Sequence, residues 1–338
     1  MSTDQLLIVI AISAYIVGTL ALLVFFLSRD RIAKLIGIPF AVIGSLTQFA
    51  ELVYRYQTSH IWPLTNLYGS LSLFSALSVA IFLGFAWKYD LWAVGGFVQM
   101  FAAGFLAYAL TWNEGYLPAV PALQSYWIKV HVPLVIAAYA TFMVAFSTSI
   151  MYLIKYYVER YLDRPGGGAS ASSGLQPATA SAGSAALRSQ AAPGDVRRSG
   201  NASAREALAP SMRESPAIER AAAQGSPLAL WAATMPPLAK LDILTYRIVA
   251  LGLPLLTVGI ITGAWWAKEA WGAYWQWDPK ETAALTSWIV YAMYMHLHTR
   301  SSWRGVRSAW MSVFGFITII FCYLGVNIWI SGLHSYKM

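Results

Sequence analysis

Charged residues and cysteine are both scarce in this chain of 338 residues. Only 11% of the residues are charged and 58% are apolar or aromatic, whereas soluble domains carry about a quarter charged residues. This balance excludes a water-soluble globule. It also excludes an intrinsically disordered chain, which requires low hydrophobicity and high charge. The composition therefore predicts an all-α, polytopic integral membrane protein.

The cysteine count excludes several kinds of site. The single cysteine, Cys322, lies in an apolar run, so the chain has no pair for an internal disulfide and no cysteine-based zinc or iron–sulfur site. It contains no Cys-x-x-Cys-His sequence, which excludes a c-type haem attached to the chain itself. Histidine is also sparse, and the five histidines can be considered one by one.

Apolar runs of about 20 residues, the length that crosses a bilayer, recur along the chain. The sequence predicts eight transmembrane helices, at residues 6–27, 35–54, 68–87, 91–112, 131–155, 243–264, 281–299 and 309–331. The first run lacks the basic n-region and the small-residue cleavage site of a signal peptide. We therefore expect it to remain as a transmembrane helix.

The basic residues indicate membrane orientation rather than nucleic-acid binding. The formal net charge of +8 is expected in a membrane protein whose cytoplasmic loops face anionic lipid. Lys and Arg are more frequent in the loops that are cytoplasmic when both termini lie outside. We predict that the N- and C-termini lie on the outer, extracytoplasmic side, and that nucleic acid is not a partner.

Residues 161–240 differ in composition from the rest of the chain. They are rich in Ala, Ser, Gly and Pro with scattered Arg, and such a segment cannot bury enough apolar surface to offset its ordering entropy. We predict a disordered cytoplasmic linker, with a short helix around residues 206–224. The linker separates a five-helix part, residues 1–160, from a three-helix part, residues 241–338.

Tryptophan is concentrated between the sixth and seventh predicted helices. Five tryptophans lie within the segment Trp265–Trp277. Aromatic belts at membrane interfaces account for some of them but not for this density, which favours stacking against a large, flat, apolar ligand such as a porphyrin. The predicted platform, in an outer loop at residues 264–281, comprises Trp265, Trp266, Trp271, Gly272, Tyr274, Trp275, Trp277 and Asp278.

The segment Trp271–Glu281 reads WGAYWQWDPKE and resembles the WWD signature of proteins that handle haem in cytochrome c maturation. Its Asp-Pro-Lys-Glu continuation resembles the CcsA branch of system II, also called ResC or CcsB. The segment Pro63–Ser70 resembles this branch too, although the family usually has glutamate where this chain has Gly69 or Ser70.

The resemblance implies a function and partners. It implies that the chain binds haem b non-covalently, in transit, and delivers it to the outer platform. With a ResB/CcsB-type membrane protein it would support thioether attachment of haem to the Cys-x-x-Cys-His segment of apocytochrome c, as part of a holocytochrome c synthase. A thioredoxin-like thiol reductant is a further expected partner. The expected location is the cell (plasma) membrane rather than the thylakoid membrane.

Two histidines are predicted to lie level with the platform. His131 falls at the outer end of the fifth helix, and His334 follows the outer end of the eighth. Two neutral imidazoles on opposite faces are the simplest axial set for six-coordinate haem iron. The resemblance assigns this role to two outer histidines, which His131 and His334 match.

His296 is predicted to lie deeper, about 22 Å along the seventh helix at a rise of 1.5 Å per residue. An ionisable group at such a depth marks a functional site. The resemblance makes His296 one ligand of a second haem position inside the membrane, with the other ligand supplied by the partner. His298 lies on a different face of the helix, and we expect a structural role for His60.

The main alternative function is a haem transporter or chaperone without a part in ligation, similar to CcmC, a family that usually has six helices. An electron-transfer cytochrome would need paired histidines on facing helices, whereas His296 and His298 lie on one helix. A structural aromatic-belt protein without a ligand does not account for the tryptophan cluster.

Four charged residues near the platform are open to more than one interpretation. Lys280 and Lys268 either pair with haem propionates or extend to water at the interface. Asp278 either caps the seventh helix or orders the loop, and Glu281 stabilises the helix N-terminus.

Overall fold

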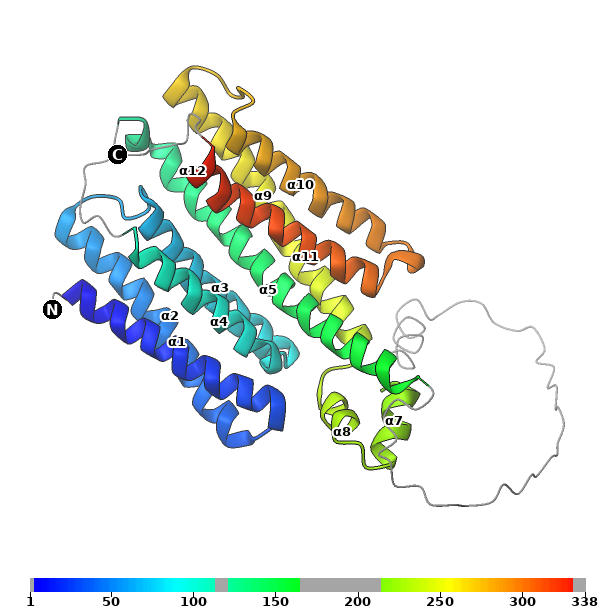
Figure 1. Cartoon of the computed structure of the whole chain (residues 1–338). Coiled ribbons are helices and arrows are strands. Elements are labelled where there is room, and N and C mark those ends of the chain that lie inside the picture. The colour runs from blue at the N-terminus through cyan, green and yellow to red at the C-terminus, as the bar shows by residue number, and fades with distance from the viewer. Residues whose placement is uncertain (1–2, 113–120, 165–213, 331–338) are drawn as a thin grey trace, which may run out of the picture. The chain divides into compact units, whose positions relative to one another are not determined.

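The computed structural model describes residues 3–112, 121–164 and 214–330. In these residues the chain forms helices and no strand (Figure 1). The long helices are α1 (Thr3–Ser28), α2 (Arg31–Ser59), α3 (Leu67–Tyr89), α4 (Gly95–Leu110), α5 (Tyr126–Leu162), α9 (Leu238–Trp271), α10 (Pro279–His298) and α11 (Val306–Ile320). The all-α prediction is confirmed, and each predicted helix corresponds to one of these.

The helices have the length and composition of membrane spans. Seven helical segments of the described chain are long and apolar enough to cross a membrane. They correspond to every predicted helix except α10. This helix has 20 residues, enough to span the hydrocarbon core, but it carries Lys280, Glu281 and two histidines and is more polar. The protein is an integral membrane protein, and the side on which each terminus lies stays a prediction.

The chain forms two compact units, residues 1–156 with 234–338 and residues 157–233. The first unit includes helices from both sides of the predicted linker. In it, the first turn of α1 and the end of α12 (Val326–Trp329) lie at the same end of the bundle as the α9–α10 connection (Figure 1). This end carries the tryptophan-rich segment.

The second unit corrects part of the linker prediction. α7 (Pro216–Ala223) lies within the short helix predicted around residues 206–224, whereas α8 (Pro227–Thr234) and the start of α9 are helical where disorder was predicted. Ser215 caps α7 by accepting a hydrogen bond from the N–H of Ala217, and Pro at the first helical position favours the start. A small apolar core lies in this unit, formed by Leu162, Ile218, Ala221, Ala229 and Ala232.

Helix α9 extends beyond its predicted end. The predicted helix ends at residue 264, whereas α9 continues to Trp271 and stops at Gly272. The φ of 84° at Gly272 is the left-handed conformation of a helix C-cap. The segment AWWAKEAW contains no helix breaker. Trp265, Trp266 and Trp271 are therefore helical residues, and the loop assignment is wrong for them.

Glycines of α9 allow it to pack closely on α5. A Cβ added at Gly259 would lie 2.7 Å from the side chain of Val135, and one added at Gly263 would lie 2.6 Å from the imidazole of His131. Small residues let the backbones of transmembrane helices approach each other. This approach brings the carbonyl of Gly259 within hydrogen-bond distance of His131.

A buried polar cluster joins α2 to α3. Glu51 is fully buried, and Arg55, one turn later, is 4% exposed; Arg55 Nη1 lies 3.7 Å from Glu51 Oε1. Tyr68 donates a hydrogen bond to Glu51 Oε1 at 2.8 Å, and Ser72 donates to Glu51 Oε2 at 3.4 Å. The guanidinium lies 4.3 Å from the centroid of the Tyr68 ring. Buried charges need such pairing and hydrogen bonding.

Candidate functional site

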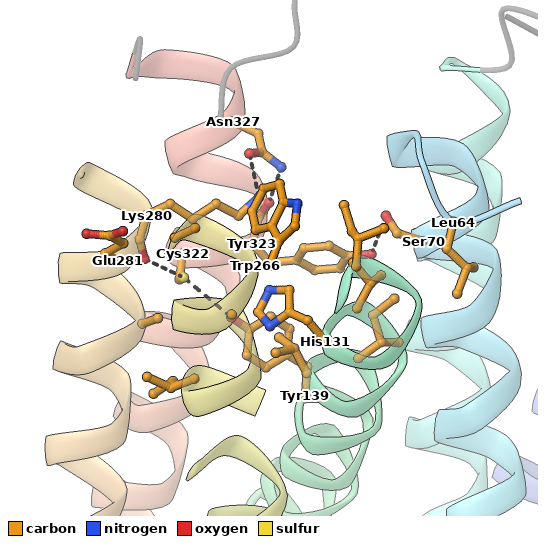
Figure 2. Close-up of a pocket in the computed structure, with 18 of the residues that line it drawn as sticks. Leu64, Ser70, His131, Tyr139, Trp266, Lys280, Glu281, Cys322, Tyr323 and Asn327 are labelled. Atoms are coloured by element: carbon orange, nitrogen blue, oxygen red, sulfur yellow. Dashed lines mark hydrogen bonds between the residues drawn. The ribbon is translucent and has the colours of Figure 1, made fainter. Parts of the chain in front are cut away.

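A cavity of about 640 Å³ opens among α5, α9, α10, the start of α3 and the segment of residues 322–328. Its size is that of a small-molecule site. One wall is apolar and is formed by Val132, Val135, Ile136, Leu256 and Ile260. The residues of functional interest in its lining are Ser70, His131, Tyr139, Trp266, Lys280 and Asn327 (Figure 2).

The imidazole of His131 lies in this lining in a defined tautomer. Nδ1 of His131 is 2.8 Å from the carbonyl oxygen of Gly259. A carbonyl oxygen only accepts, so Nδ1 carries the proton and Nε2 keeps a lone pair. Metal-binding histidines are held in this way, with one ring N–H donated to a carbonyl and the other nitrogen free to coordinate. The sequence-based choice of His131 as a ligand fits this geometry.

Three aromatic residues of the predicted platform line the cavity. Trp266 is 3% exposed and stacks on His131, with ring centroids 6.1 Å apart and an interplanar angle of 15°. Tyr274 and Trp275 follow in the α9–α10 connection. Stacked rings beside an imidazole can hold the edge of a flat apolar ligand.

The other platform residues have different surroundings. Trp265 packs against Trp127 with the two rings tilted by 39° and their centroids 4.8 Å apart. Trp271 packs edge-on against Trp266 at 4.7 Å. Trp277 is 69% exposed and has a φ of 57°. None of these three, nor Gly272, is in the cavity lining, so the tryptophans do not share one surface.

Asp278 and Glu281 cap α10. Asp278 accepts a hydrogen bond from the N–H of Lys280 at 3.1 Å. Glu281 Oε2 accepts from the N–H of Gln276 at 2.8 Å and from that of Asp278 at 3.2 Å. This is a capping box. Of the two interpretations of Asp278, capping applies, and the same bonds order the end of the α9–α10 connection.

The two lysines near the platform are in different environments. Lys280 is in the cavity lining, and its Nζ donates to Asn327 Oδ1 at 2.8 Å. Lys268 is exposed; its Nζ donates to the carbonyl of Gly272 at 2.8 Å and lies 5.7 Å from the centroid of the Tyr274 ring. Only Lys280 faces the cavity.

Neither His296 nor His298 is in the cavity lining that contains His131. His334 lies outside the described residues. His296 is exposed on α10, in a shallow hollow that also includes Trp288 and Met293. His298 is buried, and its Nε2 lies 3.0 Å from Oδ2 of Asp242. The structure therefore places His296 and His298 on different faces of α10, as expected.

Sequence reasoning missed several cavity residues. Tyr139 lies two turns after His131 on the same face of α5, a spacing that could have found it. Its hydroxyl is 3.4 Å from the sulfur of Cys322, and Tyr323 donates to Ser70 at 3.0 Å. Cys322 and Tyr323 belong to a π-helical turn, η5 (Phe321–Gly325), between α11 and α12, which has no clear sequence signal.

Comparison with known proteins identifies the family. A family model described as cytochrome C assembly protein matches residues 64–334. The chain is 38% identical over 311 residues to the cytochrome c biogenesis protein CcsA of a Synechococcus species, covering 89% of this chain and 85% of that protein. The chain belongs to the CcsA family of system II cytochrome c biogenesis. The CcsA protein of Heterosigma akashiwo is 34% identical over 300 residues, which cover 88% of this chain and 83% of that protein. The CcsA protein of Porphyra purpurea is 34% identical over 312 residues, which cover 91% of this chain and 87% of that protein.

The region shared with the CcsA family includes the whole described cavity lining. The family model begins at Leu64, the first lining residue, and continues beyond Ile328, the last. Helices α1 and α2 precede the matched region. The cavity therefore belongs to the part of the chain that resembles other cytochrome c assembly proteins.

Proposed function

We propose that this protein binds haem in the cavity as a substrate in transit and presents it for attachment to apocytochrome c. The observation that carries the proposal is the imidazole of His131, which lines a cavity of about 640 Å³. Its Nδ1 donates a hydrogen bond to the carbonyl of Gly259, so its Nε2 keeps a lone pair for an iron ion. A neutral imidazole beside an apolar, aromatic wall is the protein's usual contribution to a haem site. The CcsA relatives are cytochrome c biogenesis proteins, which supports this choice of ligand.

His334 is proposed as the second axial ligand of the outer site. Ile328 lies in the cavity lining, and the six residues from there to His334 span at most about 22 Å when extended. This length of chain is enough for His334 to reach the cavity. Two imidazoles would keep the iron six-coordinate and leave no open position for oxygen.

The protein's part in the attachment reaction is positioning. The two thiols of the apocytochrome Cys-x-x-Cys-His segment add to the two haem vinyl groups, so that each new S–C bond is accompanied by transfer of the thiol proton to the other vinyl carbon. No nucleophile of this chain is needed. Holding the porphyrin against Trp266 and Trp275 supplies the orientation and excludes water. We propose that a ResB/CcsB-type membrane protein and a thioredoxin-like reductant act with it in the plasma membrane.

The experiment that tests the proposal is an absorption spectrum of the full chain purified with its membrane partner. We expect haem that reduces with dithionite and is extracted completely by pyridine and acid solvent, which identifies non-covalent haem b. Co-expression with an apocytochrome should give covalent cytochrome. A complex without haem contradicts the proposal, and bound haem without covalent product favours the transporter alternative.

His296 is proposed as a ligand of an earlier haem position at the membrane face of the bundle. Its ring is exposed beside Trp288 and Met293, and no second histidine lines this hollow among the described residues. We propose that the second ligand comes from the partner protein. We expect His296→Gly to lower the haem content of the complex and the yield of covalent cytochrome several-fold, because an entry ligand is lost. Free imidazole should restore both.

The control for His296 is Met293→Leu, which changes the same hollow without changing a ligand. Its haem content and cytochrome yield should equal those of the wild type. Haem added directly to detergent-solubilised His296→Gly should still bind at the His131 cavity. An unchanged cytochrome yield in His296→Gly would show that this histidine is not on the route.

A further inference from the structure

We propose that Lys280 and Asn327 form a carboxylate-binding site in the cavity, which fixes the orientation of its ligand. The inference rests on the proposed haem-binding function and adds which chemical group of the ligand is recognised. For a porphyrin the carboxylate is a propionate. Lys280 and Asn327 are then specificity-determining residues.

The ammonium of Lys280 has unused hydrogen-bonding capacity. It carries three N–H donors, and among the described residues its one side-chain hydrogen bond goes to Asn327 Oδ1, at 2.8 Å. Asn327 is itself oriented, because its Nδ2 donates to the carbonyl of Tyr323 at 2.9 Å. Figure 2 shows both bonds at the edge of the cavity. The remaining donors of Lys280 are available to a ligand.

The charge of Lys280 is compensated only in part. The carboxylate of Asp278, two residues earlier, acts on it electrostatically, but this carboxylate accepts its hydrogen bond from the backbone N–H of Lys280. The ion pairs of the described residues do not include Lys280. Glu281, the next residue, lies in the same lining, but its carboxylate accepts from the N–H groups of Gln276 and Asp278. A partly buried ammonium beside apolar surface is costly without an anionic partner. A ligand carboxylate would supply that partner.

The cavity is polar at one end and apolar along one wall, and this difference gives the ligand an orientation. Lys280 and Asn327 form a polar end, whereas the wall around Val135, Ile136 and Ile260 is apolar. A porphyrin carries both propionates on one edge and its vinyl groups on the others. Binding of the propionate edge at Lys280 directs the vinyl groups elsewhere, which leaves them to the attacking thiols.

The test compares iron protoporphyrin IX with its dimethyl ester, which lacks the carboxylates. Both are titrated into the full chain with its membrane partner, and the Soret band gives the dissociation constants. We expect the wild type to bind the diacid about tenfold or more tightly than the diester, the ratio typical of a charge-assisted hydrogen bond. Lys280→Met should bind both ligands with the affinity that the wild type has for the diester. Lys280→Arg should keep a preference for the diacid.

Lys268→Met is the matched control, because Lys268 lies one turn from the end of α9 but outside the cavity lining. It should keep the full preference. Equal binding of both porphyrins by the wild type, or a preference that survives in Lys280→Met, overturns the inference while the haem site stands. If the wild type binds neither porphyrin, the proposed function itself fails.

A second variant covers the case in which Lys280→Met binds nothing because it is misfolded. Asn327→Asp keeps the shape of the side chain and places a carboxylate beside Lys280. This carboxylate competes with that of the ligand, so the preference for the diacid should fall while diester binding stays. An undiminished preference in Asn327→Asp overturns the inference.

Discussion

Replacing His131 with glycine is expected to remove at least about nine-tenths of the haem from the purified complex, because loss of an iron ligand costs more than the 10- to 100-fold typical of an outer-shell partner. The substitution leaves a space beside Trp266 and next to the Gly259 carbonyl. Free imidazole fits that space. Added imidazole should therefore restore haem binding, as measured by the reduced absorption spectrum and by pyridine extraction.

His60→Gly is the matched control for this experiment. His60 is exposed and ends α2 with a φ of 56°, a conformation that glycine adopts readily. Its variant should keep the wild-type haem content. If His131→Gly keeps an unchanged spectrum, or if imidazole has no effect on its lost haem, then His131 is not an iron ligand.

The second large effect is expected at the buried Glu51. Glu51→Leu removes the hydrogen-bond acceptor of Tyr68 and the carboxylate beside Arg55. Breaking a buried pair in this way costs roughly 3 kcal/mol or more, because the remaining charge is left in an apolar interior. We expect that loss in the free energy of unfolding, measured by denaturation in mixed micelles.

The exposed ion pair between Lys34 and Asp90 provides the comparison. Asp90 is 78% exposed in its side chain, and the two groups lie 3.5 Å apart. Exposed pairs contribute about 0–1 kcal/mol, so Asp90→Asn should change stability little. A similar loss in Asp90→Asn and Glu51→Leu would contradict the argument that burial makes the Glu51 cluster costly to break.

The helices other than α10 were predictable from the sequence because each belongs to an apolar run of membrane length. Their ends were less predictable. α9 continues to Trp271 because the left-handed conformation of Gly272 ends the helix there. Hydropathy marks only the part of a helix inside the lipid, so it predicted an earlier end. Residues 214–240 were assigned to a linker because composition does not reveal the small Ala-rich core around Ile218.

The candidate site was predictable where it depended on residue chemistry. His131 and Trp266 were identified, since histidine is sparse in this chain and tryptophan is concentrated in one segment. The partners that give them a role were not. The Gly259 carbonyl that sets the His131 tautomer is a backbone group of another helix. The roles of Lys280 and Lys268 could be distinguished only in the structure, which shows that Lys280 lines the cavity and Lys268 does not.

The π-helical turn at Phe321–Gly325 allows the end of the bundle to tolerate a change in chain length. Such a turn holds one residue more than the α-helix around it, so the loss of one residue there gives a regular α-helix with the same register on both sides. In a regular helix, by contrast, the loss of one residue turns every later side chain by about 100° around the helix axis. Deleting Leu324, which is not in the cavity lining, would thus keep Asn327 on its side of the helix, whereas a deletion within α11 would turn Asn327 away from the cavity.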